Sequence, residues 1–104
     1  MWKKSVASLG KHVEILVWID EDDPLKNDYL NHGLGEHIKM YVKPRVGYLN
    51  FHLMVNFLSQ ESTGDWLMLW NDDALMDTEN WWNLIERIDS STPRVLNFYA
   101  PGNF

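Results

Sequence analysis

The chain has 104 residues, and 15 acidic against nine basic side chains give it a formal net charge of −6. This balance opposes general affinity for nucleic acid, whose phosphates attract lysine and arginine, so no nucleic-acid partner is expected. The chain has no cysteine and no apolar run as long as a membrane span, which excludes disulfides and thiolate metal sites and favours a single cytoplasmic domain over residues 1–104 without membrane insertion.

The first predicted element is a strand over Val13–Ile19. Its residues are almost continuously apolar, which is typical of a parallel strand that is covered on both faces. The strand ends in an acidic run, residues 20–23, followed by Pro24. Asp23 can cap a helix whose first residue is Pro24, and Gly33 can end that helix.

A second, shorter strand is predicted over Ile38–Val42, and Pro44 stops it. From Val46 to about Ser62 the apolar period becomes helical, and Gly64 follows as a left-handed stop. The apolar residues that fall on one face of this helix are Val46, Leu49, Leu53 and Phe57.

A third strand is predicted over Trp66–Trp70, and it too ends in acids within residues 71–73. The next helix is capped at residue 77 or 78 and broken by Pro93, and Val95–Tyr99 is a fourth strand candidate. Strands that alternate with helices predict an α/β fold: a mostly parallel, three- to four-stranded sheet flanked by helices.

Both acidic clusters are expected at one edge of this sheet, because ligands in such folds bind beyond the carboxyl ends of the strands. Asp72 and Asp73 are candidates for a diphosphate-metal site, since Mg²⁺ and Mn²⁺ prefer carboxylate and water oxygens. Asp20 and Asp22 can accept hydrogen bonds from a base or a ribose. The alternative interpretation is that these acids are helix caps and solvated turns, where aspartate is common.

The stretch from Val13 to about Trp82 resembles the GT-A fold of inverting, nucleotide-sugar-dependent glycosyltransferases. Residues 14–24 are similar to the family's second strand, where an aspartate at the strand end holds the nucleoside. Residues 56–66 match its helix carrying an asparagine, followed by a Gly-acid-aromatic start of the next strand. Residues 67–74 resemble its Asp-x-Asp strand end, with Asn71 in the place of the first acid.

The resemblance implies a partial GT-A fold that lacks the family's first strand and binds a nucleotide-sugar donor with Mn²⁺ or Mg²⁺. The acceptor-binding half and the catalytic base are expected beyond Phe104, so the chain is read as a truncated glycosyltransferase and the isolated chain is expected to transfer no sugar. The acceptor is not identified. Asp73 takes the metal-ligand position with Asp72 beside it. The nucleotide contacts implied by the resemblance are Asp20, Asp22, Lys43, Arg45 and Asp72.

Two other classes of function remain open. Val13 to Pro24 also looks like the opening of a phosphoacceptor receiver domain, in which Asp72 or Asp73 would accept the phosphoryl group. That interpretation lacks the required lysine after a later strand, because no lysine follows Lys43, and arginine differs in reach and geometry. The third interpretation is a non-catalytic interaction fragment with a solvated acidic edge.

The absent first strand has a consequence for the sheet, because in the family it lies between the strands at Val13–Ile19 and Trp66–Trp70. Buried backbone groups left unpaired in such a gap cost on the order of 1–3 kcal/mol each. We therefore expect these two strands to pair directly. A homodimer is expected to cover the remaining apolar surface around the tryptophans.

Overall fold

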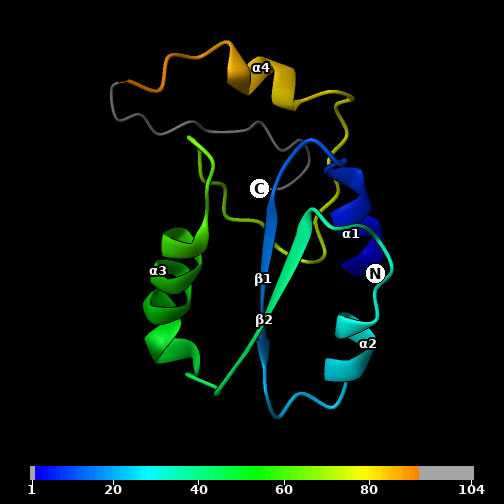
Figure 1. Cartoon of the computed structure of the whole chain (residues 1–104), viewed down its shortest axis with the longest axis vertical. Helices are drawn as coiled ribbons and strands as arrows, with labels where there is room; N and C mark the ends of the chain where they lie inside the picture. The colour runs from blue at the N-terminus through cyan, green and yellow to red at the C-terminus, as the bar shows by residue number, and fades with distance from the viewer. Residues whose placement is uncertain (1, 92–104) are drawn as a thin grey trace, which may run out of the picture.

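The computed structural model of the chain describes residues 2–91. Figure 1 shows a small sheet in the middle, with α1 and α2 on one side, α3 on the other, and α4 across the end where the strands begin. The elements in chain order are α1 (Trp2–Ser8), β1 (Ile15–Asp20), α2 (Lys26–Leu30), β2 (Ile38–Lys43), the 3₁₀ helix η1 (Tyr48–Asn50), α3 (Phe51–Glu61) and α4 (Trp82–Glu86).

The sheet is parallel, as predicted, and β1 pairs with β2 in a register that runs from Ile15 opposite Ile38 to Asp20 opposite Lys43. The chain crosses from β1 to β2 through α2, which is the connection that a parallel pair requires. This register brings the carboxyl ends of both strands to one edge. The residues that follow each strand therefore start from neighbouring positions.

The helices are shorter than the apolar periodicity predicts, and the backbone explains two of the differences. Gly47 has φ +78°, a left-handed conformation that an α-helix excludes, so η1 and α3 start only after it. Asn80 has φ +53°, and α4 accordingly begins at Trp82 rather than at the predicted caps. Among residues 2–91, no helix combines the length and the apolar character that crossing a bilayer requires.

The buried apolar core of the described residues is small. Trp81 is both buried and anchored, because its indole Nε1 donates to the carbonyl oxygen of Leu9 at 3.0 Å. Ser5 on α1 is completely buried. The buried apolar side chains are Val6, Leu9, Ile19, Ile38 and Trp81.

The predicted third strand, Trp66–Trp70, does not join the sheet, which within residues 2–91 consists of β1 and β2. The segment is held at its ends by other partners. Thr63 is hydrogen-bonded to Glu14, and the Trp70 indole is hydrogen-bonded to Ser5 on α1. The expected direct pairing of Val13–Ile19 with Trp66–Trp70 is therefore wrong. The fourth strand candidate, Val95–Tyr99, lies outside the described residues.

Candidate functional site at the carboxyl edge of the sheet

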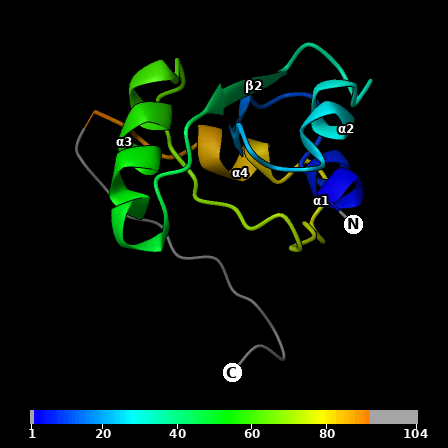
Figure 2. The same ribbon diagram turned by 90° about the horizontal axis from the view of Figure 1, so that it is seen from below.

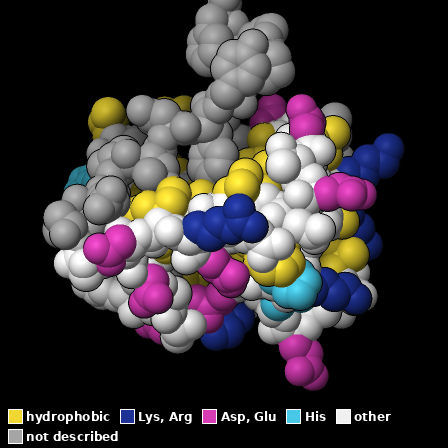
Figure 3. All heavy atoms as spheres, turned by 90° about the horizontal axis from the view of Figure 1, so that it is seen from above, with side chains coloured by type: hydrophobic (Ala, Val, Ile, Leu, Met, Phe, Trp, Pro, Cys, Tyr) yellow, Lys and Arg dark blue, Asp and Glu magenta, His cyan; other side chains and the backbone are white. Residues whose placement is uncertain are grey.

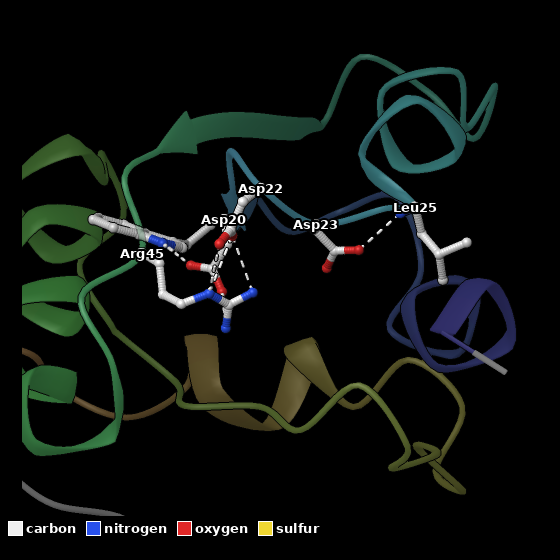
Figure 4. A network of polar contacts seen from close by, with 6 residues as sticks. Asp20, Asp22, Asp23, Leu25 and Arg45 are labelled. Atoms are coloured by element: carbon white, nitrogen blue, oxygen red, sulfur yellow. Dashed lines mark hydrogen bonds and ion pairs between the residues drawn. The ribbon is translucent and has the colours of Figure 1, made fainter.

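Three of the predicted nucleotide-contacting residues meet at the carboxyl edge of the sheet. Asp20 ends β1, Asp22 follows it by two residues, and Arg45 stands two residues after β2. The Arg45 guanidinium reaches both carboxylates (Figure 4): Nη1 lies 3.1 Å from Asp20 Oδ2 and Nη2 lies 3.0 Å from Asp22 Oδ1. Its Nε also donates to both carboxylate oxygens of Asp22 at 3.1 Å. One guanidinium thus fixes two carboxylates.

The two carboxylates of this cluster differ in their surroundings. Trp18 Nε1 donates to Asp20 Oδ1 at 3.1 Å, and the Asp20 side chain is 23% exposed. Asp22 is 60% exposed, and its hydrogen bond from Arg45, followed by the charge of that guanidinium, lowers the pKa of the Asp22 carboxyl. A carboxylate has about four acceptor positions, so ionised Asp22 keeps acceptor capacity toward solvent.

Asp23 has a local structural role but is not the predicted helix cap, because α2 begins at Lys26 with Leu25 as its N-cap residue and ends at Leu30, before Gly33. Asp23 Oδ1 accepts the backbone N–H of Leu25 at 2.8 Å, which closes the turn into α2 (Figure 4). This turn leads the chain away from β1 toward the crossover. Asp23 is thereby separated in function from the pair of carboxylates that Arg45 holds.

Lys43 points to an aromatic cluster instead of the carboxylates. Its Nζ lies 4.4 Å from the centre of the Phe57 ring on α3, a distance at which the cation is attracted to the ring face. Trp18 and Tyr41 contact the same ring edge-on, at 5.7 Å and 5.4 Å between ring centroids. We did not predict this cluster. The sequence places Phe57 on the predicted apolar helix face and Trp18 and Tyr41 in predicted strands, but the register that sets those two side by side is seen only in the structure.

Asp72 and Asp73 lie in an exposed turn closed by the Ala74 N–H to the Asn71 oxygen at 3.1 Å. Among residues 2–91, no ion pair joins them to the Arg45 cluster. Burial raises the pKa of the Tyr29 phenol on α2, and the charges of Asp23 and Asp72 raise it further. The turn therefore belongs to the α1–α2 side of the molecule. Within residues 2–91, no three histidine, aspartate or glutamate side chains converge on a group that could hold a metal ion.

A groove lies beside α4, the helix that Figure 1 shows across the end of the sheet opposite the carboxyl edge. This groove of about 580 Å³ separates the end of α1 from residues 76–82. The His12 and Trp82 rings lie on it with centroids 4.1 Å apart. Trp81 is buried and Trp82 is half-buried, so Trp82 is the ring of this pair that is open to the groove.

The carboxyl edge offers acceptor oxygens held in place by a cation, an arrangement suited to ligands that present O–H or N–H donors. A guanidinium that makes several contacts to carboxylates also limits their rotation, so the acceptors are ordered before a ligand arrives. Comparisons of the chain with protein-family models, with curated proteins and with solved structures found no match.

Proposed function

We propose that the carboxyl edge of the sheet binds a nucleotide-diphosphate sugar together with Mg²⁺ or Mn²⁺, as the nucleotide-binding part of a GT-A-like glycosyltransferase. The observation that carries the proposal is the cluster of Asp20, Asp22 and Arg45. It stands at the edge where open α/β sheets bind ligands. Its exposed acceptor oxygens match the hydroxyl and imide donors of a ribose and a uracil-like base.

In this proposal Asp22 accepts hydrogen bonds from the nucleoside, and Asp20 contributes through its less exposed carboxylate. Arg45 keeps both acids oriented, and it lowers the pKa of the Asp22 carboxyl. Fixing a substrate in this way lowers the barrier by orientation, without any chemical step at these side chains. Lys43 stands opposite Asp20 in the register, and it supplies a positive charge near the same edge.

The diphosphate is assigned to Asp72 and Asp73. Two adjacent exposed carboxylates repel the phosphates of a ligand, and Mg²⁺ or Mn²⁺, which prefer carboxylate and phosphate oxygens, would relieve that repulsion. When bound, such a cation supplies charge neutralisation of the diphosphate leaving group. The acceptor and the catalytic base are not assigned to any residue of this chain, and we expect the purified chain to transfer no sugar.

Isothermal titration with uridine diphosphate, once with Mn²⁺ and once with EDTA, tests this assignment. We expect weak binding that requires Mn²⁺. Asp73→Ala should remove the Mn²⁺ dependence, and Asp22→Asn should weaken binding roughly tenfold, the scale of one hydrogen bond to a charged group. Glu36→Gln, a change at an exposed acid that precedes β2, serves as the control. Equal affinity in EDTA, or no binding at millimolar nucleotide, would show the assignment to be wrong.

A further inference from the structure

Residues 64–71, here called the linking segment, are fastened at both ends. Just before the segment, Thr63 donates its N–H and its hydroxyl to the Glu14 carboxylate at 2.9 Å and 3.0 Å. At its far end, Trp70 Nε1 donates to Ser5 Oγ at 2.8 Å, and this hydroxyl donates to the Asn71 oxygen at 3.2 Å. The chain between these anchors is therefore held in place without being part of a helix or a strand.

The backbone between the anchors makes no hydrogen bond with the rest of residues 2–91. Within the part of the chain that the structure describes, no N–H or C=O of residues 64–70 is bonded to another residue. Figure 2 shows the segment, in yellow-green, on the side of β1 that faces away from β2. Open backbone groups on an extended chain are a template for another strand.

The side chains of the linking segment alternate between an inner and an outer face, as in a strand. Trp66, Met68 and Trp70 are half-buried. Leu67 and Leu69 point outward and are 62% and 74% exposed. Two leucines on one face of an extended chain are an apolar stripe that an added strand would cover.

Acidic side chains stand at both ends of this stripe. Asp65 precedes it, and Asp72 and Asp73 follow it, all of them exposed. Between Arg45 and Arg87 the chain has no lysine or arginine, and none of the acids of this stretch takes part in an ion pair among residues 2–91. These acids are Glu61, Asp65, Asp72, Asp73, Asp77, Glu79 and Glu86.

We propose that the linking segment is a docking strand for an extended, basic segment of another protein. The partner pairs with the free backbone groups by strand addition, covers Leu67 and Leu69 with its own apolar side chains, and places lysine or arginine opposite Asp65 and Asp73. A second copy of this chain would bring like charges to the same acids, and an anionic lipid surface would be repelled by them. Charge complementarity thus selects a basic polypeptide.

The test uses a fluorescent, blocked peptide of alternating valine and lysine, measured by anisotropy in EDTA and without nucleotide, so that the result is independent of the proposed metal and nucleotide site. We expect binding that weakens as salt rises, because the charges are exposed. A peptide of alternating valine and glutamate should not bind. A valine–lysine peptide with alternate backbone nitrogens methylated should also fail, since it keeps the charge but cannot pair as a strand.

Variants locate the surface on the protein. The double substitution Leu67→Ser and Leu69→Ser should weaken the valine–lysine peptide roughly tenfold, the scale of one uncovered leucine contact. Leu49→Ser changes a leucine on η1 that is 95% exposed and should have no effect. Asp65→Asn should cause a smaller loss that disappears at high salt.

Three results would overturn the proposal: equal binding of the methylated peptide, equal binding by the double serine variant, and light scattering that shows self-association abolished by that variant. The last would identify a second copy as the occupant. Unchanged circular dichroism of the double variant is expected, because both leucines are exposed in the chain alone.

Discussion

The Ser5 hydroxyl connects two parts of the chain that are far apart in the sequence. It is fully buried on α1, accepts from the Trp70 indole and donates to the Asn71 oxygen. A buried hydroxyl without partners would be unfavourable, whereas this one is satisfied as donor and acceptor. The contact places the turn of Asp72 and Asp73 beside α1, so a structural residue decides where the proposed metal ligands stand.

Removing this hydroxyl should therefore cost more than a typical surface substitution. Ser5→Ala leaves the Trp70 N–H and the Asn71 oxygen without their partner, and we expect the free energy of unfolding to fall by about 1–3 kcal/mol. Urea unfolding followed by tryptophan fluorescence measures the loss. Ser90→Ala, at an exposed position, should stay within about 0.5 kcal/mol of the parent. A Ser5→Ala protein as stable as the parent would mean that water replaces the lost contacts.

Glu14 ties the start of the sheet together and makes stability depend on pH. The hydrogen bond from Lys39 is the main reason that the pKa of the Glu14 carboxyl lies below its usual 4.5, and the N–H of Thr63 adds to it. A carboxyl whose pKa is lowered by folding stabilises the fold above its unfolded pKa, and this contribution is lost as the pH falls through the folded value.

We accordingly expect Glu14→Gln to lower the midpoint of urea unfolding at pH 7, and the difference from the parent to shrink as the pH falls from 4.5 toward 3. The parent should lose stability between these pH values more steeply than the variant. Glu36→Gln supplies the comparison, because no bond to Glu36 exists among the described side chains. If the urea midpoints of the parent and of Glu14→Gln changed with pH in the same way, ionisation of Glu14 would not contribute to stability.

Some of these residues could be located from the sequence and others could not. Asp20 and Asp22 follow an apolar strand, which predicts their position at the carboxyl edge, and Trp18 shares a strand face with Asp20 by the two-residue period. That Arg45 bridges both acids depends on the path of the chain after β2. The Ser5–Trp70 contact joins residues 65 positions apart, and no local sequence pattern predicts it.

At the level of elements, glycine conformation sets boundaries that apolar periodicity alone misses. The loop before β2 contains Gly35, whose φ is +134° and whose added Cβ would lie 2.8 Å from His37 Nδ1. A side chain at this position would be strained in its backbone conformation and would also come too close to the His37 ring. The loop fixes where β2 begins and hence the register that brings Asp20 opposite Lys43.

Gly35→Ala should therefore destabilise the protein by about 1 kcal/mol or more, since φ > 0 is unfavourable for alanine. Gly64→Ala is the matched comparison. Gly64 is not among the glycines with positive φ, so the predicted left-handed stop is wrong. The nearest atom to an added Cβ is the Trp66 oxygen at 3.5 Å, so little change is expected. Chemical denaturation of both variants measures the difference. Equal stabilities would show that the loop before β2 adapts without cost.

For the whole molecule, the alternation of strands and helices correctly predicted an α/β chain with a parallel pair and a helical crossover. The number of strands was not predictable, because Trp66–Trp70 has the composition of a strand but its ends are held by Glu14 and Ser5. Much apolar surface consequently remains exposed, including Tyr48 at 97% and Leu49 at 95%. Figure 3, looking onto the end that carries α4, shows hydrophobic side chains at the surface among acidic ones.

β1 is the element in which sequence and structure differ most. Its continuous apolar composition is typical of a central strand, yet within residues 2–91 it has one neighbour, β2. Ile15 N–H donates to His37 O at 2.9 Å and Glu21 N–H to Lys43 O at 2.8 Å. Both donors have odd residue numbers. In a parallel ladder the N–H groups of alternate residues point the same way, so the odd-numbered amides of β1 point to β2 and the even-numbered amides point to the opposite edge.

Amide hydrogen exchange measured by NMR tests this arrangement directly. The N–H groups of Val17 and Ile19 should exchange slowly, since they are paired with β2, and those of Leu16 and Trp18 should exchange much faster. Slow exchange of all four amides would mean that a further strand covers the free edge of β1. Repeating the exchange measurement at lower protein concentration then shows which molecule supplies that strand. If the protection fades, the strand comes from the expected homodimer, because its subunits dissociate on dilution. If the protection stays constant, the strand belongs to the same chain.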